Sequence, residues 1–369
     1  MKIVIFDIDN LNNPHWGSGQ AIATKEIGKR LIKKNHEVIV YCSKYPNYKN
    51  YKKDGITYKH IGVGTSHVRV NNIVYLLFLP FFAFFVKADI ILEHFTAPVS
   101  TCLTPLFTKI PVVGISSFFS SIKMEKKYGI KFTSFERFGA QFYKYFIPLN
   151  KQHDAKMKKL NAKIISKIIP NGVNDNYFKI KTREENYILF IGRIDVFHKG
   201  LDLLLLAYKK AERHINDDLY IIGSGPTEDV KKLKFLVDKY KLNKRVKLLT
   251  KQLGSKKDAY FKNAKFTIFP SRFEGQSLSV LESMALAKSF ICFNIPEVNW
   301  LGEKTCLKVK PFSVNQLAAK IILLSKNRAL RRLLGTNGRK QARAYTWDKT
   351  ARQYEDFLAA ILRCQTGVA

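Results

Sequence analysis

The stretch Glu274-Gly-Gln-Ser-Leu-Ser-Val-Leu-Glu282 sets two carboxylates eight residues apart. It follows the apolar run Phe-Thr-Ile-Phe-Pro at 266–270, a pattern that predicts a buried strand ended by proline. Apolar residues then recur at helical spacing from Leu278 to Ala285, so we expect Glu274 on a loop and Glu282 inside a helix. The unpaired N–H groups of that helix N-terminus favour an anion. A phosphate between two hydroxyl-binding carboxylates is the pattern of a nucleotide-sugar site; the alternative is a solvated acidic helix start.

A second strand-loop-helix unit precedes this one. Tyr187-Ile-Leu-Phe-Ile-Gly192 predicts a buried parallel strand, and a helix is predicted to begin at Gly200. The loop between them carries Arg193 and Lys199. Such units bind ligands at the carboxyl end of the strand. The guanidinium of Arg193, which can donate two parallel hydrogen bonds, and the point charge of Lys199 could neutralise a diphosphate. Both residues could equally be ordinary surface cations in a lysine-rich chain.

Strands and helices alternate in both halves of the chain, which predicts an α/β protein with two doubly wound parallel sheets. We expect a hinge near residues 164–183, where Pro170-Asn171-Gly172 has turn chemistry. The predicted strands lie near 2–6, 37–41, 56–61, 89–93 and 111–116 in the first half, and near 187–192, 218–222, 245–249, 265–269 and 289–293 in the second.

Taken together, these motifs resemble the nucleotide-sugar half of retaining GT-B glycosyltransferases. The similarity is strongest to the large group 1 family, also called family 4, with the E-x7-E signature. It covers nearly the whole chain and is most specific over residues 169–300. The residues that carry it are Gly192-Arg193, Lys199-Gly200, Gly223-Ser-Gly-Pro226, Pro270-Ser271, Glu274 with Glu282, Ile169-Pro-Asn-Gly-Val173, and, near the start, Gly17-Ser-Gly19 with Asn35-His-Glu-Val38.

The resemblance implies the GT-B architecture, in which two Rossmann-like domains face each other across a cleft. Residues 1–165 would form the acceptor-binding domain and residues 166–346 the nucleotide-sugar-binding domain. Residues 347–369 would form a helix that crosses back to the first domain.

The resemblance also implies roles for named residues. Arg193 and Lys199 would hold the diphosphate, Glu274 the transferred sugar and Glu282 the ribose of a UDP- or GDP-sugar. Since these cations supply the positive charge, no metal or other cofactor is expected. The sugar would move with retention, by attack on the face that the diphosphate leaves. The remaining donor positions would be the backbone of Gly275, Gln276, Ser277 and Leu278, the close-approach glycines Gly17 and Gly19, and Thr250 and Lys251 near the base.

The acceptor side departs from the family pattern. Many members carry a histidine after the strand that corresponds to residues 111–115, but Ser116-Ser117-Phe118 stands here. His94, at the end of the preceding predicted strand, could face the acceptor instead or could be structural. His94 and Ser117 are therefore the acceptor-side candidates.

The formal net charge of +34 predicts an anionic partner. No nucleic-acid-binding motif accompanies it, which favours an anionic membrane surface over nucleic acid. Between Ser121 and Lys151 lysines interleave with aromatics, a pattern typical of lipid headgroup contact, although core aromatics beside solvated lysines would look the same. Five cysteines without ligand spacing read as free thiols of a reducing compartment.

These features place the protein in the cytoplasm, attached peripherally to the inner face of the cell membrane. There it would act on a lipid-linked or surface-glycan acceptor, as in lipopolysaccharide or capsule biosynthesis. The apolar run 73–86 contains Pro80. We expect it to be too short to span, broken at the proline, and buried or interfacial.

Two alternatives come from other classes. Asp7-Ile-Asp9 resembles the nucleophile motif of haloacid-dehalogenase-type phosphatases, but Leu11 stands where those enzymes have Thr or Val. It also resembles the metal-binding Asp-x-Asp of GT-A transferases, where the motif lies mid-chain. The other alternative is a basic, non-enzymatic nucleic-acid-binding protein, which charge alone suggests.

Overall fold

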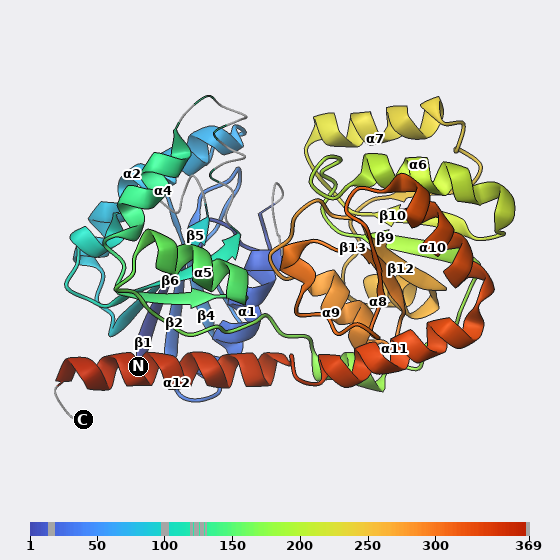
Figure 1. Cartoon of the computed structure of the whole chain (residues 1–369). Helices are drawn as coiled ribbons and strands as arrows, with labels where there is room; N and C mark the ends of the chain where they lie inside the picture. Colours follow the sequence, from blue (N-terminus) through green and yellow to red (C-terminus); the bar gives the residue numbers. More distant parts are fainter. Residues whose placement is uncertain are drawn as a thin grey trace. The chain divides into compact units, whose positions relative to one another are not determined.

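The computed structural model describes residues 1–13, 19–96, 103–118, 121, 125, 129 and 131–366. The chain divides into two compact units. The first unit combines Met1–Asn171 with Trp347–Ala369, and the second is Gly172–Thr346. Each unit is built on a central sheet with helices packed on it (Figure 1). The division after Asn171 falls within the turn Pro170-Asn171-Gly172.

The first unit contains a parallel sheet with one antiparallel edge strand. The predicted strands near 2–6, 37–41, 56–61, 89–93 and 111–116 are present, and three short strands that the sequence pattern did not predict, β3, β7 and β8, extend the sheet. Among the strands that the structure describes in this unit, β3 alone runs antiparallel to its neighbour. In spatial order the strands are β3 (Tyr51–Lys53), β4 (Ile56–Ile61), β2 (Glu37–Ser43), β1 (Lys2–Phe6), β5 (Ile90–Thr96), β6 (Val112–Phe118), β7 (Tyr145–Pro148) and β8 (Ile165–Ser166).

The described helices of the first unit are α1 (Gly19–Ile32), α2 (Val68–Phe85), η2 (Thr104–Leu106), α4 (Phe132–Ala140), α5 (Lys151–Leu160) and α12 (Trp347–Thr366). The C-terminal helix α12 packs on α1 and runs along the edge of this unit (Figure 1). Ion pairs of Arg30 with Asp348 and of Lys34 with Glu355 join the two helices.

Helix α2 differs from the prediction for residues 73–86. It is continuous through Pro80 and begins at Val68, so its length and composition alone would allow it to cross a membrane. Pro80 removes one backbone hydrogen bond, but the stripe Tyr75, Leu79 and Ala83 packs into the core on both sides of it. Only 22% of the helix is buried, so of the two placements that we expected, buried or interfacial, the buried one is wrong and the interfacial one stays a prediction.

The described aromatic residues between Ser121 and Lys151 are of two kinds, buried and exposed. Tyr143, Tyr145 and Phe146 are buried in the core, whereas Phe135 and Phe138 on α4 are exposed. Part of the aromatic pattern is therefore explained by packing and not by lipid.

The second unit has a six-stranded, wholly parallel sheet. Its spatial order is β11 (Val246–Leu249), β10 (Asp218–Ile222), β9 (Tyr187–Ile191), β12 (Phe266–Phe269), β13 (Phe290–Phe293) and β14 (Leu307–Val309). All the predicted strands are present, and β14 was not predicted. The chain order reverses between β9 and β12, so their carboxyl ends form the topological switch point at which such sheets bind ligands.

Helices cover both faces of this sheet and supply its core. They are α6 (Leu201–Ala211), α7 (Thr227–Lys239), α8 (Gly254–Asn263), α9 (Leu278–Ala285), α10 (Val314–Lys326) and α11 (Arg328–Ala342), with short turns η3 (Asp175–Lys179), η4 (Glu212–His214) and η5 (Pro296–Val298). Phe266 and Ile268 of β12 and Leu281 of α9 are fully buried in one cluster. The start of α9 is therefore fixed against the strand that leads to it.

Acid should destabilise the first unit through His153, which is buried on α5. Its Nδ1 lies 2.9 Å from Ser116 Oγ, and burial lowers the pKa of His153 to about 4. Between pH 6.5 and 4 the unfolded chain binds a proton that the folded chain does not, so the free energy of unfolding falls as pH drops. We expect a loss of up to about 2 kcal/mol from this site between neutral pH and about pH 5.

Denaturant unfolding of the first unit at neutral pH and at about pH 5 measures this loss. His153→Gln should reduce the difference, whereas His214→Gln, at an exposed position of the second unit, should not. An unchanged pH dependence in His153→Gln would show that His153 is not responsible.

Candidate active site

Two loops meet at the switch point of the second unit. One, residues 192–200, joins β9 to α6, and the other, residues 270–277, joins β12 to α9. Gly200 has φ +64°, and a Cβ there would lie 2.0 Å from the carbonyl oxygen of Pro270. Only glycine allows this approach, which brings the loop with Arg193 and Lys199 against the loop with Glu274.

Arg272 fastens the two loops together. Its backbone N–H donates to the carbonyl of His198 at 2.9 Å, and its guanidinium donates to the carbonyl of Phe197 at 2.6 Å. The same guanidinium makes a bidentate pair with Asp202 of α6, at 2.8 and 2.7 Å. Both loops are therefore held by charge-assisted hydrogen bonds as well as by the backbone contact.

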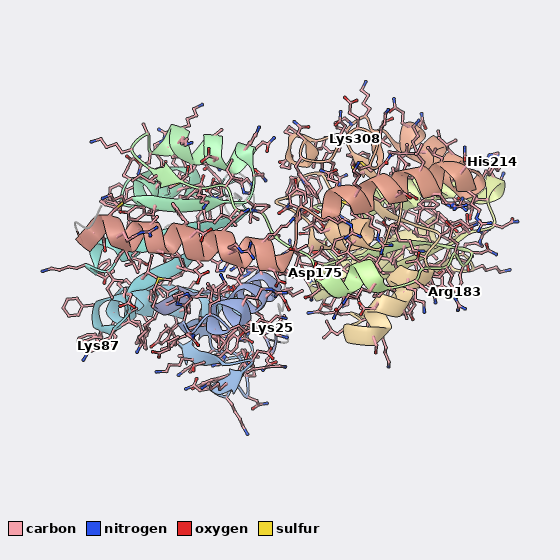
Figure 2. The ribbon with its side chains drawn as sticks, turned by 90° about the horizontal axis from the view of Figure 1, so that it is seen from below. Lys25, Lys87, Asp175, Arg183, His214 and Lys308 are labelled. Atoms are coloured by element: carbon pink, nitrogen blue, oxygen red, sulfur yellow. The ribbon has the colours of Figure 1, made fainter. Side chains whose placement is uncertain are left out.

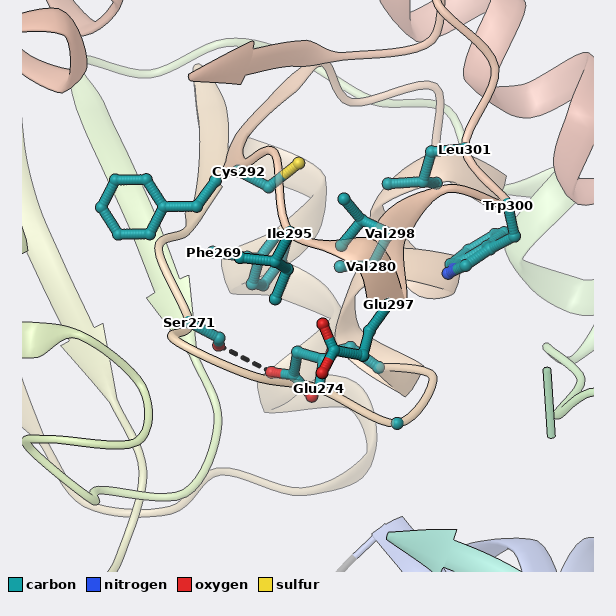
Figure 3. Close-up of a pocket in the computed structure, with 13 residues that line it drawn as sticks. Phe269, Ser271, Glu274, Val280, Cys292, Ile295, Glu297, Val298, Trp300 and Leu301 are labelled. Atoms are coloured by element: carbon teal, nitrogen blue, oxygen red, sulfur yellow. Dashed lines mark hydrogen bonds between the residues drawn. The ribbon is translucent and has the colours of Figure 1, made fainter. Parts of the chain in front are cut away.

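Lys199 and Glu274, both predicted as catalytic, form an ion pair. Ser271 Oγ donates to the same carboxylate oxygen, Oε1, at 2.7 Å (Figure 3). Both side chains are largely buried, with 16% and 15% exposed. The cation and the carboxylate thus neutralise each other, and a ligand with a phosphate and hydroxyls could engage both.

Arg193 lies on the same loop as Lys199, and its guanidinium points toward His198. The sequence analysis did not identify His198 as a residue of the site. Arg193 Nη2 is 3.0 Å from His198 Nδ1 and 3.6 Å from Asp195 Oδ2. His198 Nε2 lies 2.9 Å from the carbonyl of Phe273, and since a carbonyl only accepts, Nε2 carries the proton and Nδ1 accepts from Arg193. His198 therefore links the two loops and orients Arg193, whose side chain is 43% exposed.

Glu282 lies in α9, as predicted, and is paired with a residue that the sequence did not suggest. Lys257 Nζ on α8 is 2.5 Å from Glu282 Oε1. Glu282 Oε2 is buried and, among the described residues, has no hydrogen-bond partner. Burial raises the pKa of Glu282, and Lys257 opposes this. The free oxygen can accept from a hydroxyl, which is the chemistry of ribose binding.

The backbone positions predicted to bind the donor lie where α9 begins. Gly275 and Gln276 precede the helix, and Ser277 is its N-cap without a side-chain capping hydrogen bond. The side chain of Ser277 therefore does not cap the first-turn N–H groups, which begin at Leu278. Such groups bind anions.

A small pocket opens beside Glu274 (Figure 3). Its walls are mostly apolar, with Val280, Ile295 and Trp300 among them, and Glu297 of η5 adds a second carboxylate. Burial raises the pKa of Glu297, and the charge of Glu274 adds to the effect. Glu297 belongs to the site by position, but it lies outside both motifs that the sequence singled out.

The other predicted donor positions are less closely gathered. Thr250 and Lys251 are exposed and follow β11, which β10 separates from β9. Gly19 begins α1 in the first unit, while Gly17 lies outside the described residues.

The acceptor-side candidates lie in the first unit. His94 is buried in β5, with Nε2 2.9 Å from Thr24 Oγ1 and 3.5 Å from Asp7 Oδ2. Burial lowers the pKa of His94, and Asp7 opposes this. Ser117 lies in β6, but its side chain is outside the described residues.

Asp7, the nucleophile of the phosphatase alternative, is fully buried and engaged. It accepts hydrogen bonds from Gln20 Nε2 and Thr24 Oγ1, both at 2.6 Å, and from the N–H of Asp9 at 3.1 Å. A carboxylate held in this way is not presented for attack on a phosphate. Among the described residues, no group of three or more His, Cys, Asp or Glu side chains could hold a metal.

Comparison with known proteins agrees with this geometry. Residues 174–341 match the family described as Glycosyl transferases group 1. This part of the chain is a group 1 glycosyltransferase domain. An uncharacterised glycosyltransferase of Methanocaldococcus jannaschii is 27% identical over 266 residues, which cover 71% of this chain and 72% of that protein. The group 1 domain contains Arg193, Lys199, Glu274 and Glu282.

Solved structures confirm the predicted GT-B fold. Sucrose-phosphate synthase from Thermosynechococcus elongatus superposes with a TM-score of 0.82 at 17% identity, over 98% of this chain and 99% of that one. The Anabaena protein HepE, solved with UDP and glucose, has a TM-score of 0.77 at 13% identity, over 97% and 99%. The chain therefore has the GT-B fold. The group 1 match and the archaeal relative, not these structures, support glycosyltransferase activity.

The pair of Lys257 and Glu282 predicts a stability defect that a second substitution repairs. Lys257→Ala leaves a buried carboxylate without its cation and should lower the free energy of unfolding of the group 1 domain by roughly 2–4 kcal/mol. Glu282→Gln in the same chain removes the buried charge and should restore most of that loss.

Denaturant unfolding of the wild type, Lys257→Ala, Glu282→Gln and the double variant measures the coupling between the two residues. Lys256→Ala, at an exposed neighbouring position, is the control. If the double variant were as unstable as the sum of the two single ones, Lys257 would not act through Glu282.

Proposed function

We propose that this protein transfers a sugar from a nucleotide-diphosphate sugar, with retention of configuration and without a metal ion. The observation that carries the proposal is the pairing of cations with the two E-x7-E carboxylates at the switch point, Lys199 with Glu274 and Lys257 with Glu282. Each carboxylate that would bind hydroxyls lies beside a cation. The start of α9, which the side chain of Ser277 does not cap, lies between the two carboxylates in the chain.

The proposed roles follow from position and charge. Arg193 and Lys199 stabilise the departing diphosphate, Glu274 holds the sugar, and Glu282 accepts hydrogen bonds from the ribose. The bond between sugar C1 and the diphosphate oxygen breaks while the acceptor oxygen attacks C1 from the same face. The acceptor gives its proton to the leaving diphosphate. A preorganised donor at such a charge is worth about 3–4 kcal/mol.

The donor is proposed to be a UDP-sugar or a GDP-sugar. The HepE structure holds UDP and glucose, which supports a UDP-sugar through the shared fold. The exposed residues Thr250 and Lys251 are the proposed contacts of the base. A panel of nucleotide diphosphates in thermal unfolding identifies the base, since a ligand at 100 times its Kd adds about 2.7 kcal/mol of stability.

The acceptor is proposed to be lipid-linked or a growing surface glycan, such as lipopolysaccharide or capsule, met at the inner face of the cell membrane. The net charge of +34 supports an anionic surface as the partner. His94 and Ser117 remain the candidates for the acceptor side.

Removing either cation should slow turnover while the fold persists. Arg193→Ala and Lys199→Ala should each lower kcat by about 100-fold or more, because they act on charge that develops as the diphosphate leaves. Glu282→Ala should mainly raise the KM for the donor. Release of nucleoside diphosphate from the donor measures all three.

Lys210→Ala serves as the control, because this lysine is exposed on α6 outside both loops. Wild-type turnover in either cation variant would refute the diphosphate assignment.

Activity should not depend on a divalent cation. Arg193 and Lys199 are proposed to supply the positive charge that a metal supplies in a metal-dependent transferase. In the described part of the chain, no group of three or more His, Cys, Asp or Glu side chains could hold a metal. Turnover should persist in EDTA. Complete loss in EDTA that manganese or magnesium restores would point instead to a metal-bridged site, with Asp7 and Asp9 as the first residues to test.

A further inference from the structure

The outer face of α2 is the largest run of exposed apolar side chains on one described element. Leu77 is 73% exposed and Phe84 69%. Ile73, Phe81 and Phe85 are more than half exposed, and Val70 and Phe78 add to the same side of the helix. Isolated exposed apolar residues are ordinary, but a continuous face of this kind marks an interaction surface.

The inner face of the same helix is fixed to its unit. Tyr75, Leu79 and Ala83 pack into the core, and Tyr75 Oη donates to the carbonyl of Tyr41 at 3.2 Å. Asn71 exchanges hydrogen bonds with the backbone of Thr65, at 2.9 and 2.7 Å. Turning the helix out of its unit would expose these groups, so α2 presents its apolar face while it stays docked.

The charged residues that bound this helix in the chain, Arg69 and Lys87, are both cations. No charged residue occurs between Arg69 and Lys87, and no acidic residue occurs between Asp54 and Asp89. The neighbouring turn η2 adds exposed Leu106 and Phe107, with Lys109 after them and no acidic residue from His94 to Met124. Figure 2 shows Lys87 at the outer margin of the unit. An apolar face flanked by Arg69, Lys87 and Lys109 complements an anionic lipid surface.

We infer that α2 lies flat in the interface of an anionic bilayer, with its outer apolar face among the acyl chains and Lys87 and Lys109 at the headgroups. The helix is about 27 Å long, but its docked inner face prevents it from spanning. This inference deepens the proposed membrane location and rests on it, and it does not depend on the donor assignment. It predicts attachment that salt weakens but does not abolish, because acyl-chain burial is not screened.

The test is flotation of the full chain with vesicles of mixed phosphatidylglycerol and phosphatidylcholine. At low salt the wild type should bind these vesicles more tightly than pure phosphatidylcholine vesicles. At about 1 M sodium chloride, where the Debye length is about 3 Å, a measurable fraction should remain bound. Leu77→Asn with Phe84→Ser should lower the partition coefficient by about 100-fold, roughly tenfold for each buried side chain.

Two further variants separate the contributions of the apolar side chains of α2 and of the cations to vesicle binding. Phe235→Ser with Leu333→Asn removes comparably exposed apolar residues from the second unit and should bind as the wild type does. Lys87→Gln with Lys109→Gln should weaken binding at low salt by roughly fivefold per cation and leave the salt-resistant fraction intact.

Absence of vesicle binding by the wild type would overturn the inference, as would equal binding by the Leu77→Asn, Phe84→Ser variant. Sedimentation velocity tests whether a second copy covers the face: dimerisation that this variant abolishes, without vesicle binding, would also overturn it. Stabilisation by UDP or GDP, measured on the same chains, reports separately on the donor site. The two measurements are independent. The chain can bind vesicles without binding a nucleotide, or bind a nucleotide without binding vesicles, and each result is distinguished.

Discussion

The approach of one backbone to another at Gly200 is the constraint on which the candidate site depends. A Cβ at that position would overlap the carbonyl of Pro270, and φ of +64° excludes most side chains in any case. The contact fixes the loop after β9 against the loop after β12, and Arg272 then ties them by hydrogen bonds to Phe197, His198 and Asp202. Arg193 and Lys199 are thus carried on a loop whose backbone is fixed against the loop of Glu274.

Charge pairing is the second principle of the site. Glu274 and Glu282 would repel a diphosphate if they stood alone, yet each is bound to a lysine. A ligand that brings both phosphates and hydroxyls can divide each pair, with the phosphate taking the cation and the hydroxyl the carboxylate. A free phosphate satisfies only the cation and leaves a carboxylate behind. The arrangement therefore favours a ligand with both groups close together, as in a nucleotide-sugar.

The sequence predicted the long features and missed the short or distant ones. The buried apolar strands and both loops at the switch point were predictable, because parallel strands read as apolar runs and their loops follow directly. Strands β3, β8 and β14 have two or three residues, too few for a pattern. Lys257 could not be inferred, since the fold alone brings α8 beside α9, and Glu297 enters the site from the loop after β13.

Helix α2 shows where composition and structure must be combined. From sequence alone we expected a break at Pro80, because proline removes a backbone donor. The polar residues Asn71 and Asn72 interrupt the apolar pattern, so the start of the helix at Val68 was not predicted. The packed stripe of Tyr75, Leu79 and Ala83 outweighs that loss and leaves the opposite face, with Leu77 and Phe84, in solvent. Exposing so much apolar surface is unfavourable in water and becomes favourable in lipid. A glycosyltransferase that meets lipid-linked acceptors would gain stability and substrate access from the same face.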